Sequence, residues 1–218
     1  MNSTERSVVV TGGSGFIGSN VCKQFVENGF TVINIDKRKR EMEGVTQYPF
    51  EVDNKQVQGI LKLIKPDVVV HIAAYNSVPD SLVNTNQTYT DNVYSTISLL
   101  NNCVDAGVKN FIFASSSSVY GTSINEDGSF KETDPLSPIN PYGDTKAAIE
   151  KILSNLFSSG DKSWSIVNLR YFNPIGAHES GLIGENPNGI PNNLFPYICQ
   201  VAAGKLEKIK IFGKNWPT

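Results

Sequence analysis

The stretch that decides the fold is Val8-Val9-Val10-Thr11-Gly12-Gly13-Ser14-Gly15-Phe16-Ile17-Gly18, near the start of a chain of 218 residues. Its valines predict a buried strand and the apolar spacing after Gly15 predicts a helix, so the glycines fall at the turn between them. They fit both GxxGxxG and GxGxxG, and a turn without Cβ atoms lets a pyrophosphate approach the N–H groups of a helix N-terminus. A glycine-rich turn that holds no ligand is the alternative. The predicted dinucleotide contacts are Gly12, Gly15, Phe16, Ile17 and Gly18.

The chain then alternates between short apolar segments and segments of helical periodicity. The predicted strands are residues 7–11, 31–35, 66–73, 110–114 and 165–169. The predicted helices are residues 15–28, 54–65, 87–106 and 141–159. Nearly continuous apolar strands that alternate with helices indicate an α/β fold of the Rossmann type, a doubly wound parallel sheet covered on both faces. Such sheets bind ligands at the carboxyl ends of their strands.

The composition changes after about Pro174. Residues 176–193 are rich in Gly, Pro and Asn and predict a long loop, which precedes a short helix at 192–203 and a strand-like segment at 208–212. We therefore expect an NAD-binding domain over residues 1–175 and the start of a smaller, partial substrate-binding domain over residues 176–218.

Charge and cysteine content narrow the class of protein. Lys and Arg number 19 against 21 Asp and Glu, a net charge of −2, so we expect no non-specific binding of nucleic acid or of an anionic membrane. The N-terminus lacks the apolar core of a signal peptide, and no later stretch approaches a membrane-spanning length. Three widely spaced cysteines without a CxxC favour reduced thiols in a cytoplasmic protein.

A second feature supports dinucleotide binding. Asp36 ends the second predicted strand, where a carboxylate accepts hydrogen bonds from the adenosine ribose and repels a 2′-phosphate, which favours NAD over NADP. The basic run Lys37-Arg38-Lys39-Arg40 follows directly. It fits a solvated loop, and it leaves attraction of a 2′-phosphate as the other interpretation.

Hydroxyl groups and a lysine suggest chemistry at the same sheet edge. Tyr142-Gly143-Asp144-Thr145-Lys146 is a YxxxK, which places Tyr142 and Lys146 on one helix face. The ammonium is expected to lower the pKa of Tyr142 towards that of a general base, although such a pair also occurs by accident on surface helices. The strand 110–114 opens into Ser115-Ser116-Ser117-Ser118-Val119-Tyr120-Gly121. Together with the glycine turn, these groups predict a site that moves a hydride and a proton.

These motifs together resemble the extended short-chain dehydrogenase/reductase superfamily. Within it, Leu169-Arg170-Tyr171-Phe172-Asn173-Pro174-Ile175-Gly176-Ala177-His178 and Gly189-Ile190-Pro191-Asn192-Asn193-Leu194-Phe195-Pro196-Tyr197 resemble the UDP-glucose 4-epimerase family, and the similarity runs over essentially the whole chain. The resemblance implies NAD as cofactor and a UDP-sugar as substrate. The implied reaction is inversion of C4 of a UDP-hexose through a transient 4-keto sugar.

The resemblance also implies roles for individual residues. Ser116 matches the catalytic hydroxyl that contacts the sugar, Tyr142 the catalytic base, and Lys146 the lysine that holds the nicotinamide ribose and polarises the tyrosine. Asn92 matches an asparagine near the nicotinamide, and Asp53 the acidic residue beside the adenine. The further positions that match substrate contacts are Asn173, Asn193 and Leu194.

Three departures from the family pattern leave other functions open. Asn76 replaces a lysine that reaches the cofactor phosphates, the usual Asn-Val-x-Gly-Thr has Ser95 in place of its glycine, and the stretch between Asp36 and Asp53 is short. Another nucleotide-sugar epimerase or a 4,6-dehydratase is therefore an alternative. Against the dehydratase, Ser117-Ser118 stand where such enzymes carry an Asp-Glu pair.

The resemblance implies two further expectations. Relatives continue beyond the end of this chain, so we expect a C-terminal truncation, and an NAD-binding chain without turnover is a third interpretation. The helices predicted at 87–106 and 141–159 resemble those that pair in the dimers of the family, which implies a homodimer.

The two histidines do not indicate a metal site. His71 is expected to be a packed strand residue, and neither histidine lies in a cluster with metal-ligand spacing.

Overall fold

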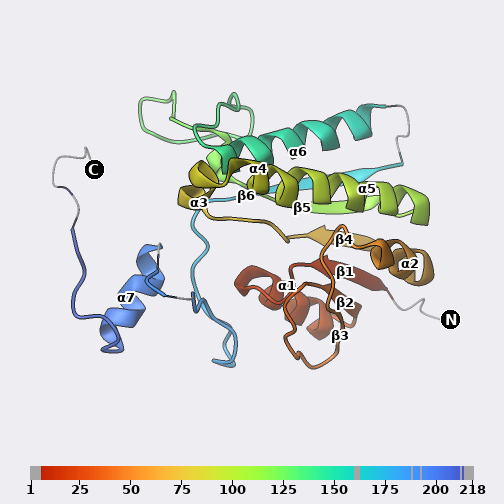
Figure 1. Ribbon diagram of the computed structural model, residues 1–218, viewed down its shortest axis with the longest axis horizontal. Coiled ribbons are helices and arrows are strands. Elements are labelled where there is room, and N and C mark those ends of the chain that lie inside the picture. The colour runs from red at the N-terminus through yellow and green to blue at the C-terminus, as the bar shows by residue number, and fades with distance from the viewer. Residues whose placement is uncertain (1–5, 160–162, 188, 192, 212, 214–218) are drawn as a thin grey trace. The chain divides into compact units, whose positions relative to one another are not determined.

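A parallel sheet forms the centre of the larger part of the molecule. The computed structural model describes residues 6–159, 163–187, 189–191, 193–211 and 213. The chain divides into two compact units, Met1–Pro174 and Ile175–Thr218. The first contains six parallel strands in the order β3-β2-β1-β4-β5-β6 (Figure 1). Their bounds are β1 (Ser7–Thr11), β2 (Thr31–Ile35), β3 (Val45–Tyr48), β4 (Val68–His71), β5 (Asn110–Ser116) and β6 (Ser165–Tyr171).

The helices of this unit begin and end at residues suited to those positions. Asn54 caps α2 by accepting a hydrogen bond from the N–H of Gln56, and Asn140 caps α6 in the same way, with Pro141 in the first turn. Gly107 ends α5 in the left-handed conformation. The helices are α1 (Phe16–Glu27), α2 (Lys55–Ile64), α3 (Val78–Val83), α4 (Thr85–Tyr89), the π-helical turn η1 (Thr90–Tyr94), α5 (Ser95–Ala106), the 3-10 turn η2 (Ser117–Val119) and α6 (Pro141–Ser158).

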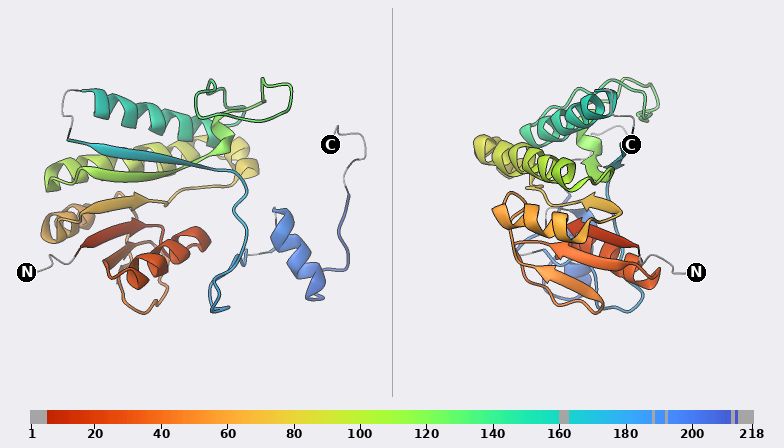
Figure 2. Two further views of the ribbon diagram at one scale, coloured as in Figure 1. Left: turned by 180° about the vertical axis from the view of Figure 1, so that it is seen from behind. Right: turned by 90° about the vertical axis from the view of Figure 1, so that its right-hand side faces the viewer.

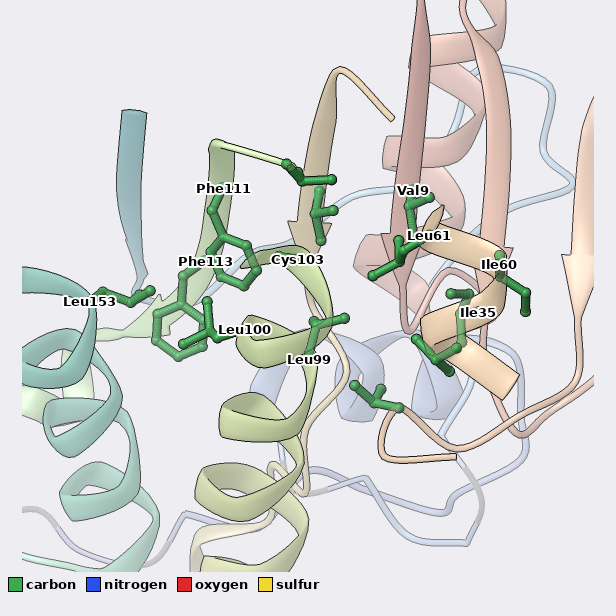
Figure 3. Packing of buried hydrophobic residues seen from close by; sticks show 14 of the residues in the cluster. Val9, Ile35, Ile60, Leu61, Leu99, Leu100, Cys103, Phe111, Phe113 and Leu153 are labelled. Carbon is green, nitrogen blue, oxygen red and sulfur yellow. The ribbon is translucent and has the colours of Figure 1, made fainter. Parts of the chain in front are cut away.

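Side chains of alternating strand residues pack on the two faces of the sheet. Val9 of β1 belongs to a core with residues of α2, α5 and α6, whereas Val8 and Val10 pack with Cys22 of α1. Figure 2 shows α1 on the face of the sheet opposite to α2 and α5. Figure 3 shows the larger core, in which side chains from α2, α5 and α6 meet the β-strands. Its labelled members are Val9, Ile35, Ile60, Leu61, Leu99, Leu100, Cys103, Phe111, Phe113 and Leu153. The predicted doubly wound parallel sheet is confirmed.

The structure differs from the predicted elements at several points. β3 was not predicted because Val-Thr-Gln-Tyr is half polar and forms the edge of the sheet, where burial on both faces is not required. The single helix predicted over 87–106 is broken into α4, η1 and α5. Neither α3 nor η2 was predicted, because each is a short element between longer ones.

In the residues that the structure describes, the second compact unit contains one helix and much irregular chain. Helix α7 spans Leu194–Ala202, close to the helix predicted at 192–203, although Asn192 lies outside the described residues. The loop predicted before it has one bridge, between Ala177 and Gly184. The strand predicted at 208–212 is wrong for residues 208–211, which have no regular structure, and Phe212 is outside the described residues. Within the described part of the chain, no helix has the length and apolar character needed to cross a membrane.

Candidate active site

The glycine turn connects β1 to α1 with close backbone contacts. Gly12 has a positive φ of 77°, and a Cβ there would lie 2.6 Å from the backbone N of Ala73. A Cβ on Gly18 would collide with the carbonyl oxygen of Gly12. Gly15 is the N-cap residue of α1, and the first N–H groups of that helix, those of Phe16 and Ile17, have no partner within the helix. Both residues are partly exposed, so the turn presents free donors and a positive helix end to an anion.

Asp36 is fixed directly beside this turn. It is 7% exposed, and its two carboxylate oxygens accept hydrogen bonds from the backbone N–H of Ser14, at 3.0 Å, and of Arg38, at 2.8 Å. The guanidinium of Arg38 lies 3.8 Å from the same carboxylate, with the arginine side chain 68% exposed. Arg40 contacts the carbonyl of Ser14 and the hydroxyl of Ser19. Only part of the basic run is therefore the solvated loop that the sequence suggests.

Ser116, Tyr142 and Lys146 gather where β5 ends against α6. Lys146 is 2% exposed, donates a hydrogen bond of 2.8 Å to the carbonyl oxygen of Ala114 and lies 5.8 Å from the centre of the Tyr142 ring. The hydroxyl of Ser116 hydrogen-bonds Tyr142 and accepts from the N–H of Ser118. The N–H of Tyr142 donates to the hydroxyl of Ser81, which ties the start of α6 to α3. Three groups that can hold or move a proton thus share one site.

The ionisation of this cluster differs from the prediction. Burial raises the pKa of Tyr142 above its usual value, and the hydrogen bond from Ser116 opposes that shift. The predicted lowering of the tyrosine pKa is therefore wrong for the chain alone. Burial instead acts on the lysine, lowering the pKa of Lys146 to about 7, because the charged ammonium is enclosed away from water.

The burial of Lys146 predicts a pH dependence of stability. The folded chain releases this proton near pH 7, whereas the unfolded chain retains it up to about pH 10.5, so unfolding takes up a proton in between. The free energy of unfolding should therefore rise with pH, and Lys146→Met should remove the rise and stabilise the chain at lower pH. Urea unfolding between about pH 7 and about pH 8.5 measures this below the range where the thiols of Cys22 and Cys103 act in the opposite direction.

The control for this experiment is Lys151→Met on the same helix. Lys151 is exposed, so removing its charge should leave the slope of stability against pH unchanged. A slope that persists in Lys146→Met would show that another group carries the pH dependence.

The remaining predicted residues lie at several places. Asn92 is 1% exposed in η1, where its side chain accepts from the N–H of Tyr75 at 2.7 Å and donates to the hydroxyl of Thr145. Asp53 is exposed in the turn before α2 and Asn173 is exposed after β6. The structure thus brings Asn92 to the helix that carries Tyr142 and Lys146, and leaves Asp53 and Asn173 in solvent.

Two predicted residues belong to the second compact unit. Asn193 is the N-cap residue of α7, and its side-chain amide donates to Glu185 at 3.0 Å. Leu194 is 69% exposed in the first turn of that helix.

An ion pair between buried Glu150 and partly buried Arg170, next to the cluster, was not predicted. Glu150, one turn beyond Lys146 on α6, accepts from the hydroxyl of Ser115 at 2.5 Å and from the guanidinium of Arg170 at 2.7 and 3.0 Å. Arg170 also donates to the hydroxyl of Tyr120 at 2.7 Å. These contacts join α6 to both β5 and β6. Glu150 and Arg170 lie on different elements, α6 and β6, so no spacing along the sequence indicated this pair.

This fold and site define a short-chain dehydrogenase/reductase, and comparisons with known proteins narrow the class. Residues 8–216 match the NAD dependent epimerase/dehydratase family. The UDP-glucose 4-epimerases of Bacillus subtilis and Neisseria meningitidis serogroup C are 39% and 41% identical to the chain, over 97% and 98% of its length. The chain therefore belongs to the NAD dependent epimerase/dehydratase family. It spans 66% of the length of these two relatives.

Solved structures show the same similarity. One is the UDP-glucose 4-epimerase of Stenotrophomonas maltophila with bound NAD and formylated UDP-arabinopyranose, with a TM-score of 0.92 and 35% identity over 98% of this chain and 67% of that one. Another is the enzyme from Bifidobacterium longum in complex with NAD⁺ and UDP, with a TM-score of 0.88 and 36% identity over 97% and 67% of the two chains.

Proposed function

We propose that this chain carries the NAD site and the proton-transfer residues of a UDP-glucose 4-epimerase, an isomerase that interconverts UDP-glucose and UDP-galactose through a 4-keto sugar. The observation that carries the proposal is the grouping of Ser116, Tyr142 and Lys146, with Ser116 and Lys146 buried, at the carboxyl end of the same parallel sheet whose strand β1 leads into the glycine turn. Family membership and the named activity of the relatives support it.

The residues around the glycine turn fit NAD. A Cβ on Gly15 would lie 3.4 Å from both the guanidinium of Arg38 and the carbonyl oxygen of Gly12, so the absence of a side chain leaves that room for a bound phosphate. The N–H groups of Phe16 and Ile17 would hold the pyrophosphate, and Asp36 would accept from the ribose hydroxyls. When bound, NAD supplies the acceptor and donor of the C4 hydride.

Side chains of this protein would accept and return the proton of the sugar 4-hydroxyl. Tyr142 would take the proton of the sugar 4-hydroxyl and return it after the sugar has turned, with Ser116 hydrogen-bonded to the same oxygen. Lys146 stands beside the phenol as an amine that changes charge near neutral pH, and so would favour the phenolate when it is protonated.

The remaining predictions are kept as part of this proposal. Residues 1–175 would form the NAD-binding domain, with Asp53 beside the adenine, and residues 176–218 part of the substrate-binding domain. Asn173, Asn193 and Leu194 would contact the nucleotide-sugar. We also propose a homodimer, on the resemblance of its long helices to those that pair in family dimers. The free thiols of Cys22, Cys103 and Cys199 suit a cytoplasmic location.

The direct test is to incubate the purified chain with UDP-galactose and follow the formation of UDP-glucose. Appearance of UDP-glucose with no net consumption of NAD supports the epimerase. Accumulation of a 4-keto-6-deoxy sugar would instead identify a dehydratase. If the chain binds NAD but leaves UDP-galactose unchanged, the result would favour an NAD-binding chain without turnover.

Cofactor preference gives a separate prediction. NAD should bind at least about tenfold more tightly than NADP, because the carboxylate of Asp36 repels a 2′-phosphate. Asp36→Asn should narrow this ratio, since it removes the charge and leaves Arg38 in place. Isothermal titration with both cofactors measures the ratio. Glu41→Gln, which removes an exposed carboxylate of the same loop, should not change it. Tighter binding of NADP to the unaltered chain would overturn the assignment.

A further inference from the structure

His71 lies at the end of β4, fully enclosed within the sheet. It is 1% exposed, pairs in register with Thr11 of β1 and with Phe113 of β5, and stacks on the ring of Phe113 with centroids 5.9 Å apart. Its two ring nitrogens both contact hydroxyls: Nδ1 lies 2.6 Å from Thr11 Oγ1, and Nε2 lies 2.8 Å from Thr96 Oγ1. An apolar environment therefore holds a fully hydrogen-bonded imidazole.

The direction of each hydrogen bond follows from its neighbours. Thr96 Oγ1 lies 2.6 Å from the carbonyl oxygen of Asn92, which can only accept, so the single hydroxyl proton of Thr96 is used there. Thr96 Oγ1 must then accept from His71, and His71 carries its proton on Nε2. Nδ1 is left as the acceptor for the hydroxyl proton of Thr11. Thr11 Oγ1 in turn is within 3.4 Å of the N–H of Ala73.

This series of hydrogen bonds connects the glycine turn, at one end of the candidate site, to η1 and α6 at the other end. Thr11 immediately precedes the glycine turn. Asn92 lies in the π-helical turn η1, and its side chain joins the backbone of Tyr75 to the hydroxyl of Thr145, the residue before Lys146. Within the described residues, every buried side-chain nitrogen or oxygen has a hydrogen-bond partner, so this path contains no gap that another group would fill.

We propose that His71 is a positioning residue of the cofactor site: as a neutral Nε2–H imidazole it couples the glycine turn, through Thr11, to the π-helical turn that carries Asn92, through Thr96. The inference rests on the proposed function, because it assigns the two joined regions to the two ends of one bound NAD. His71 itself touches neither cofactor nor substrate in this role.

The neutral state of the ring is physically favoured. Enclosure removes water from an imidazolium and the charge of Lys146 repels one, and together they lower the pKa of His71 to about 3. The aromatic neighbours Phe111 and Phe113 offer no charge to compensate. The ring therefore keeps the same proton across the working range, which suits a fixed connection and not a proton donor.

The first test needs no cofactor. Nitrogen NMR of the imidazoles should show His71 protonated on Nε2, unprotonated on Nδ1, and unchanged from about pH 5 to about pH 8, a range in which an unperturbed histidine titrates. Thr96→Val should in addition speed hydrogen exchange at the N–H of Tyr75, which the side chain of Asn92 holds. A titrating His71, or a proton on Nδ1, would overturn the proposal.

The second test compares the affinities for two ligands, one that occupies both ends of the site and one that lacks the nicotinamide end. Thr96→Val and His71→Phe should weaken NAD by about five- to tenfold more than they weaken ADP-ribose, which lacks the nicotinamide. Thr88→Val is the matched control, because Thr88 is also fully buried and also donates to the carbonyl four residues before it, at 3.0 Å, without contacting His71. Its ratio of NAD to ADP-ribose affinity should equal that of the unaltered chain.

The outcomes distinguish this inference from the proposed function. Equal loss of NAD and ADP-ribose affinity in folded Thr96→Val would contradict the coupling. If the unaltered chain binds neither ligand, the proposed function fails. The imidazole spectrum and the exchange rate of the Tyr75 N–H still test whether His71 connects the glycine turn to η1. Should His71→Phe not fold, Thr96→Val alone carries both measurements.

Discussion

Tyr142→Phe should abolish epimerisation, lowering the turnover of UDP-galactose by about 10²–10⁴-fold, the usual contribution of a positioned general base. The substitution removes one oxygen atom, the only atom of the side chain that can accept the proton of the sugar hydroxyl. The ring remains and should keep its place at the start of α6, where its backbone N–H is held by Ser81. NAD affinity and the melting temperature should therefore change little, and turnover should fall through kcat.

The control for this prediction is Tyr89→Phe in α4. Tyr89 is 40% exposed, so loss of its hydroxyl should leave turnover within about twofold of the unaltered chain. Turnover of Tyr142→Phe within about tenfold of the unaltered chain would show that another group accepts the proton. Ser116 would then be the first residue to test, because it is hydrogen-bonded to the same phenol.

The main strands and helices could be predicted because the sequence patterns that indicate them are local. The Val8–Val10 run, the glycines that follow it and the apolar stripe of residues 141–159 each lie within one turn or one element of the chain. Their spacing alone indicates strand, turn and helix. The pairing of Tyr142 with Lys146 is local in the same sense, since four residues of helix place both on one face.

The features that sequence did not predict depend on partners far along the chain. The π-helical turn at Thr90–Tyr94 lies inside a segment with helical periodicity, and the contacts of Asn92 with Tyr75 and Thr145 are formed only in the folded chain. Likewise, the pKa of Tyr142 is governed by burial, which spacing along a helix does not reveal. His71 was correctly expected to be a packed strand residue, but its contacts with two threonines could not be anticipated.

Among the variants considered, Glu150→Ala should lower the free energy of unfolding most, by about 3–5 kcal/mol. The substitution leaves the mostly buried guanidinium of Arg170 without its carboxylate partner. Ser115 loses its acceptor at the same time. Urea unfolding measures the loss, and turnover should fall with it, since Ser115 adjoins Ser116 and Glu150 lies one turn from Lys146.

Two further variants decide whether the loss arises from the unpaired charge. Glu150→Ala combined with Arg170→Met should be more stable than Glu150→Ala alone, because the second change removes the charge that the first one leaves unpaired. Lys62→Ala breaks an exposed ion pair with Asp105, 3.7 Å long, and should cost at most about 1 kcal/mol. If Glu150→Ala costs no more than Lys62→Ala, the ion pair does not hold α6 against β5 and β6. The position of Tyr142 and Lys146 must then come from the apolar packing of α6 and from their own hydrogen bonds to Ser81 and Ala114.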